Sequence, residues 1–66
     1  MAVVKVIELL SESEVSWENA TKTAVKEAAK TIHNIQSVYV EHMQAIVNGD
    51  EIVKYRVNVK ISFLVE

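Results

Sequence analysis

The C-terminal part of the chain alternates strictly between apolar and polar residues, and this pattern restricts the fold more than any other feature. The apolar side chains occupy every second position, namely Val53, Tyr55, Val57, Val59, Ile61, Phe63 and Val65. The positions between them carry Lys54, Arg56, Asn58, Lys60 and Ser62. Because neighbouring side chains of a strand point to opposite faces, the alternation predicts a half-buried strand over residues 52–65 in a single register. The polar face of this strand must meet either water or a space shared with other subunits.

The chain is short for a protein with its own hydrophobic core. Its 66 residues predict a single domain, residues 1–66, in a size range where one core gives little net stability. The sequence has no cysteine, which excludes disulfides and thiolate metal sites and fits a reducing cytoplasm. Self-association is therefore the expected source of additional burial.

The charge of the chain argues against two classes of partner. The formal net charge of −2 and the pI near 5.6 create no field that would attract nucleic acid or an anionic membrane. No apolar run approaches the roughly 18 to 20 residues that a membrane-spanning helix needs. We expect a soluble protein with neither a nucleic-acid partner nor a membrane partner.

The first half of the chain predicts a strand followed by a helix. Residues 3–10 are rich in Val, Ile and Leu, which favours a strand covered on most of both faces, and Ser11 to Val15 should end it. Ser16 is a suitable helix N-cap. From there the apolar residues recur at steps of three or four, at Trp17, Ala20, Ala24, Ala28, Ile32 and Ile35. This spacing predicts a helix of about five turns, whose alanines let it lie close to a sheet.

A row of lysines should lie on the opposite surface of this helix. Lys22, Lys26 and Lys30 are spaced four residues apart and therefore form one basic ridge. The ridge is either a solvated face or a row of partners for acidic groups on a neighbouring subunit or an anionic ligand.

The remaining segment predicts a second strand and a hairpin. Residues 37–47 change the parity of their apolar positions, which predicts either a bulge near Glu41 and His42 or burial on both faces. Residues 48–51 contain the only glycine and form a turn signal. The expected fold is α+β, with the order β-α-β-β and a three-stranded antiparallel sheet wrapped on one helix. The third strand should be central, so that the order in the sheet is 1-3-2.

Four segments of the sequence together resemble the dodecin family. They are KVIEL in the first strand, Ser16-Trp17-Glu18-x-Ala20 at the helix start, Lys30-Thr31-Ile32-x-Asn34-Ile35 at its end, and Tyr55-x-Val57-x-Val59-x-Ile61-x-Phe63 in the last strand. The match covers about residues 4–65 with almost unchanged spacing. The resemblance implies a homo-dodecamer in which twelve copies form a hollow shell.

The resemblance also implies a ligand site at three positions. Dodecins typically bind flavins such as FMN or riboflavin between subunits, through a stacking Trp in the second strand and a Gln in the third. This sequence has Ser37 and Arg56 at the matching positions, so we expect no flavin binding in the family's usual manner. Tyr39 shares the parity of Ser37 and could provide another stacking surface.

Because it lacks this Trp, the sequence is similar to a branch of the dodecin family that is associated with calcium. Calcium takes six to eight oxygen ligands, and Glu41, Asp50 and Glu51 could supply some of them if symmetry brought copies together. No loop of the chain has calcium-ligand spacing of its own, so the sequence leaves the metal ligands unassigned.

The other chemically interesting residues favour structural roles. Trp17 should anchor the helix entry, while His33 and His42 belong to different elements without a surrounding ligand pattern. No sequence motif indicates a catalytic nucleophile. The leading hypothesis is a non-enzymatic shell that binds, stores or buffers a small ligand. The alternatives are flavin storage through another stacking residue, calcium binding, and a structural assembly without a ligand.

Overall fold

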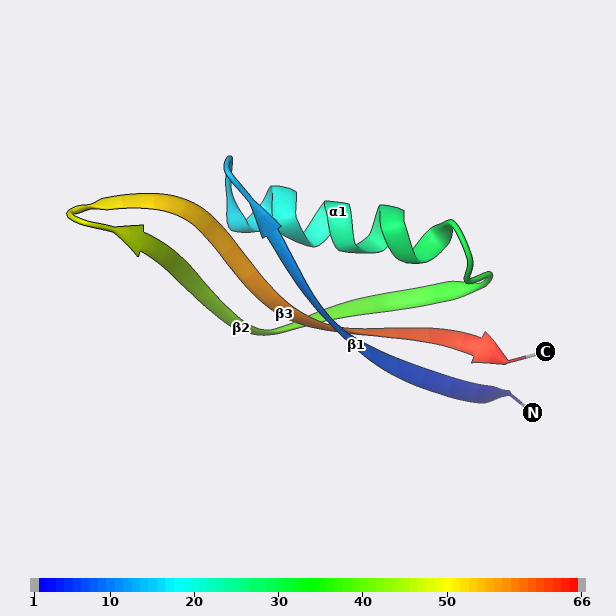
Figure 1. The fold of residues 1–66 in the computed structure, drawn as a ribbon. Coiled ribbons are helices and arrows are strands. Elements are labelled where there is room, and N and C mark those ends of the chain that lie inside the picture. The colour runs from blue at the N-terminus through cyan, green and yellow to red at the C-terminus, as the bar shows by residue number, and fades with distance from the viewer. Residues whose placement is uncertain (1, 66) are drawn as a thin grey trace.

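The computed structural model describes residues 2–65 and contains one helix and three strands (Figure 1). In chain order the elements are β1 (Val3–Ser13), α1 (Trp17–Ala29), β2 (Ile35–Asn48) and β3 (Glu51–Val65). The strands form one antiparallel sheet in the order β1-β3-β2. The predicted fold class, the element order and the central position of the third strand are confirmed.

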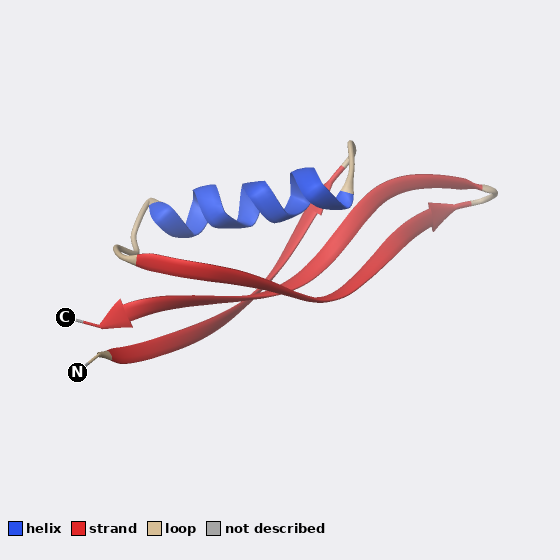
Figure 2. Ribbon diagram, turned by 180° about the vertical axis from the view of Figure 1, so that it is seen from behind, coloured by secondary structure: helices blue, strands red, loops and turns tan. Residues whose placement is uncertain are grey.

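The helix covers one face of the sheet and forms the core there (Figure 2). Its buried positions are all alanine, and they pack against the central strand. The core consists of Ala20, Ala24 and Ala28 from α1 and of Val57, Val59 and Ile61 from β3. Small side chains on the helix let its axis approach the sheet, so that the β-branched residues of β3 become fully buried. The strict alternation of the last strand therefore correctly identified the core face.

The start of the helix is fixed as the sequence predicts. Ser16 has an extended backbone, and its hydroxyl accepts a hydrogen bond from the Asn19 amide at 2.9 Å. The Trp17 indole lies edge-on to Tyr55, with 4.9 Å between ring centroids, and its Nε1 donates to the Gln44 carbonyl at 2.9 Å. Trp17 thus anchors the helix entry to both β2 and β3.

The helix is shorter than the predicted five turns, and that prediction was wrong. It has 13 residues and ends at Ala29, because the chain then tightens into a turn in which the amides of Thr31 and Ile32 both bond to the Ala28 carbonyl. Asn34 follows with φ of 63°, a left-handed conformation that redirects the chain into β2. The helix is neither long nor apolar enough to cross a membrane.

The first strand differs from its prediction in two ways. It continues to Ser13 instead of ending at Leu10, because Ser11 and Ser13 remain in register with β3 and bond to the helix through their hydroxyls. Only one of its faces is covered within the chain. On the other face Val4, Val6 and Leu10 are each more than half exposed, so the expected burial of both faces is wrong for the isolated chain.

A β-bulge in β2 explains the change of parity along that strand. The register with β3 shifts between Val40 and His42, so Glu41 is the extra residue. After the bulge Met43 and Ala45 return to the helix-facing side, opposite Val57 and Tyr55. The bulge alternative is therefore confirmed, and β2 extends beyond the predicted residues 37–47 at both ends.

The turn between β2 and β3 forms at the predicted glycine. Asn48 pairs with Glu51, so Gly49 and Asp50 make up the turn. Gly49 has φ of +68°, which the first central residue of the favoured hairpin turns requires.

The close approach of helix and sheet yields the first prediction. Ala24 is 3% exposed, so Ala24→Leu should overpack the interface and destabilise the protein by about 1–3 kcal/mol. Thermal unfolding should show this as a loss of roughly 4–8 °C for each kcal/mol. Thr23→Leu, a change at the adjacent exposed position, is the matched control and should leave the melting temperature nearly unchanged. Equal shifts for the two variants would contradict the close packing.

Candidate functional site

The sheet face opposite the helix has no covering element within residues 2–65, and it carries the predicted site residues. We call it the open face. Cross-strand partners share a face, so the register of the sheet assigns its members. They are Val4, Val6, Glu8, Leu10 and Glu12 from β1, Lys54, Arg56, Asn58, Lys60, Ser62 and Leu64 from β3, and Ser37, Tyr39, His42, Gln44 and Ile46 from β2. The open face is apolar along much of β1, and it is polar along β3.

Ser37 lies opposite Ser62 on the open face. The two hydroxyl oxygens are 2.5 Å apart, so each side chain already has a hydrogen-bond partner inside the chain. Ser37 is exposed, but it offers only a small polar surface, without the π-system that stacking on a flat ring requires.

Tyr39 is the exposed aromatic residue of the open face. It lies opposite Lys60, two residues beyond Ser37, and 65% of it is accessible to solvent. Ser37 and Tyr39 lie on the same face of the sheet, as their positions in the sequence predict. Tyr39 could therefore present a ring to a ligand or to another subunit.

Arg56 is bound by an acid of its own chain. Its Nε donates to Glu12 Oε2 at 2.7 Å, and its Nη2 contacts the same oxygen. Lys54 Nζ lies 3.7 Å from the other carboxylate oxygen of Glu12. Each of the three side chains is a third to a half exposed. The two cations and one carboxylate leave a formal charge of +1 at this end of the open face.

The ion pair changes the acidity of Glu12. The hydrogen bond from Arg56 lowers the pKa of the Glu12 carboxyl from its ordinary value of 4.5. Partial desolvation opposes this effect, while the positive charges of Arg56 and Lys54 reinforce it. Glu12 is thus held in its ionised form as the partner of Arg56.

The predicted site residues do not come together within one chain. Ser37 lies opposite Ser62, which is six residues from Arg56 along β3, so about 20 Å separates the two positions. Tyr39 lies opposite Lys60 and is roughly 13 Å from Arg56 by the same spacing. A ligand shorter than this separation could contact residues of both ends only if they came from different copies.

The β-bulge places a further polar group on the open face. Lys60 Nζ lies 3.5 Å from Glu41 Oε2. Within the described residues this oxygen and Asn58 Oδ1 are buried without a hydrogen-bond partner. A buried acceptor without a donor costs about 1–3 kcal/mol, so these two oxygens are suited to accept donors from outside the chain. The parity change along β2 indicated this bulge, but it could not show which face Glu41 would join.

The acids proposed as calcium ligands lie apart. Glu41 is in the middle of β2, whereas Asp50 and Glu51 are at the hairpin, about 20 Å further along the strand. Residues 2–65 contain no group of three or more His, Cys, Asp or Glu side chains that could hold a metal ion. A calcium site does not fit the residues of a single chain.

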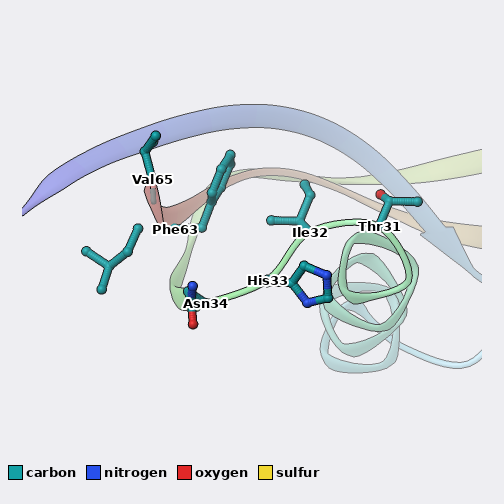
Figure 3. Close-up of a pocket in the computed structure, with 7 residues that line it drawn as sticks. Thr31, Ile32, His33, Asn34, Phe63 and Val65 are labelled. Atoms are coloured by element: carbon teal, nitrogen blue, oxygen red, sulfur yellow. The ribbon is translucent and has the colours of Figure 1, made fainter.

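A separate depression of about 260 Å³ lies where the chain leaves the helix (Figure 3). Its lining residues are Thr31, Ile32, His33, Asn34, Phe63, Leu64 and Val65. Figure 3 shows His33 beside the end of the helix, away from Val65. The described lining includes no carboxylate that could pair with His33 as an acid-base pair of the kind used in catalysis.

Comparisons of sequence agree with the geometry. The family model described as Dodecin matches residues 3–66. The calcium dodecin of Mycobacterium tuberculosis is 32% identical over 63 residues, which cover 96% of this chain and 89% of that protein.

Solved structures have the same fold. A mutant of the T. thermophilus dodecin matches with a TM-score of 0.94 and 26% identity, covering 100% of this chain and 98% of that one. A dodecin from Streptomyces davaonensis matches with a TM-score of 0.92 over 98% of this chain and 96% of that one. Its identity is 20%, so this second match shows the fold alone.

The Glu12–Arg56 pair yields a prediction about pH. Because the pKa of Glu12 is lowered in the folded chain, its stabilising contribution is present above pH 4.5 and is lost as the pH falls through the lowered value. Glu12→Gln should therefore lower the melting temperature near neutral pH, and the difference from the unmodified protein should vanish in strong acid. Glu14→Gln is the control, since Glu14 makes no ion pair within residues 2–65. A difference that does not depend on pH would contradict the assigned role of the carboxylate.

Proposed function

Because the chain belongs to the dodecin family, we propose that it is a non-enzymatic binding protein that assembles into a hollow homo-dodecamer. The ligand is a small molecule or ion held between the open faces of neighbouring copies. Storage or buffering of this ligand is the corresponding role, in the cytoplasm.

The exposed apolar strip on β1 is the observation that carries this proposal. Val4, Val6 and Leu10 all lie on the open face, more than half exposed, beside the polar row of β3. Three largely exposed apolar side chains on one face of so small a chain, interrupted only by Glu8 within the described strand, are typical of a surface that another protein covers. Covering it would bring the polar groups of two copies to face each other and would create the enclosed space that a ligand site needs.

The residues at the flavin-equivalent positions support a ligand other than flavin held in the usual mode. Ser37 is bonded to Ser62, and Arg56 is paired with Glu12, so neither position presents the stacking ring or the free amide of a flavin site. Flavin storage remains a second candidate through Tyr39, whose ring is exposed on the same face.

Calcium binding is a third candidate, favoured by two observations. The relative from Mycobacterium tuberculosis is a calcium dodecin, and the oxygens of Glu41 and Asn58 that accept no hydrogen bond within residues 2–65 are ligands of the type that calcium takes. Lys60 lies close to Glu41 and would have to move away, and further oxygens would have to come from other copies. A structural shell without a ligand is the remaining alternative.

The proposed assembly predicts the mass of the native particle. Native mass spectrometry should find roughly 90 kDa, twelve times the chain mass of 7.4 kDa. A stable monomer at micromolar concentration would refute the assembly, and with it the ligand site between copies.

The replaced flavin positions predict weak flavin binding. Riboflavin and FMN should bind the unmodified chain about 30- to 1000-fold more weakly than the double variant Ser37→Trp with Arg56→Gln, which corresponds to roughly 2–4 kcal/mol of stacking and hydrogen bonding. Quenching of flavin fluorescence during titration measures both affinities.

Two further variants separate the contributions to flavin binding. Ser37→Leu with Arg56→Gln adds a bulky side chain without a ring and should not increase affinity. Tyr39→Leu in the unmodified chain tests the second candidate. Nanomolar flavin binding that disappears in Tyr39→Leu would replace the proposed ligand class with flavin.

A further inference from the structure

The hairpin between β2 and β3 extends beyond the rest of the molecule (Figures 1 and 2). The last residue of β1 pairs with Tyr55, so residues 46–54 form a ribbon of only two strands. We call these residues the arm. Neither β1 nor the helix covers the arm, and the overall dimensions of 51 × 20 × 13 Å reflect its projection.

The arm is apolar near its tip. Val47 is 59% exposed and Ile52 is 55% exposed, and the two residues are cross-strand partners. Val53 is also exposed. An isolated two-stranded ribbon is marginally stable at best in water. Exposed β-branched side chains at its end therefore indicate a surface that packs against another protein surface.

The tip of the arm is acidic. Asp50 and Glu51 are exposed, and neither forms an ion pair with another described residue. The tip therefore combines two negative charges with an adjacent apolar pair, Val47 and Ile52.

A groove between the helix and β2 has the complementary character. It has a volume of about 320 Å³ and is lined by Thr21, Lys22, Val25, Lys26 and Val38. Val25 and Val38 are apolar and half-buried, whereas Lys22 and Lys26 are exposed, so the groove combines an apolar lining with positive charge on its solvent side. The one ion pair of these lysines within residues 2–65, from Lys22 to Glu18 at 3.4 Å, joins two largely exposed side chains and is therefore easily exchanged.

The arm cannot reach the groove of its own chain. Val38 lies opposite Ile61, whereas the tip begins at Asn48, ten residues further along the same strand. That spacing is about 30 Å along a continuous ladder. Only the arm of another copy could occupy the groove.

We propose that the acidic tip of the arm of one copy docks in the lysine-rimmed groove of a second copy. Val47 and Ile52 pack on Val25 and Val38, while Asp50 and Glu51 pair with Lys22 and Lys26. Because the two surfaces differ, the contact is heterologous, and its repetition closes into rings or a shell. This inference rests on the proposed homo-oligomer and names the contact that joins its copies.

Charge reversal on each side tests the contact. Lys22→Glu with Lys26→Glu should raise the protein concentration at which the assembly dissociates by about tenfold or more, because like charges then meet across the interface. Asp50→Lys with Glu51→Lys should have the same effect. The chain that carries all four changes should return to within about threefold of the unmodified protein, since the pairing is restored with opposite signs. Sedimentation at a series of protein concentrations measures each midpoint.

Single charge reversals outside the two surfaces control for a general effect of charge, and a pair of apolar substitutions controls for folding. Lys30 lies on the same ridge but outside the groove, and Glu14 is an exposed acid outside the arm. Lys30→Glu and Glu14→Lys should therefore leave the midpoint unchanged. Ile52→Thr keeps the strand but removes the apolar contact and should weaken assembly, whereas Val15→Thr, at another exposed position, should not.

The outcomes distinguish this inference from the proposed function. If the unmodified chain is a monomer, the proposed function fails. If it assembles but the reversals and Ile52→Thr act no more strongly than their controls, the arm contact is wrong while the assembly stands. Failure of the four-change chain to recover would also overturn the pairing.

Discussion

One short helix has to cover a long sheet, and the rest of the structure follows from this mismatch. The 13 residues of α1 span about 20 Å, whereas the molecule is 51 Å long. The helix can therefore bury only the middle of one sheet face. Within residues 2–65 no other element covers the second face or the hairpin end of the sheet, although each carries apolar side chains.

The side chains between the helix and the sheet are closely packed. Three alanines on the helix meet three β-branched residues of the central strand, and all six are buried. This core is compact but small, and a chain of this size gains little net stability from it. The proposed association of copies would bury the remaining apolar surface.

The length of the sheet also limits which residues of one chain can form a single site. Within one chain the predicted ligand residues Ser37 and Arg56 lie about 20 Å apart along the sheet. Each already has an internal partner, Ser62 for the hydroxyl and Glu12 for the guanidinium. Contact of both residues with one small ligand would therefore require the open faces of two copies, as the proposed assembly supplies.

The sequence by itself determined the features that depend on local periodicity and backbone preference. These are the alternation of β3, the Ser16 cap and the Gly49 turn, because each depends on residues that are close together in the sequence. Tertiary structure decided the rest. The helix ended at Ala29, before the left-handed Asn34 that redirects the chain into β2, and the bulge assigned Glu41 to the open face. Glu12 and Arg56 are 44 positions apart, so no local pattern could pair them. Their contact exists because β1 and β3 are neighbours in the sheet, which places the two side chains opposite each other.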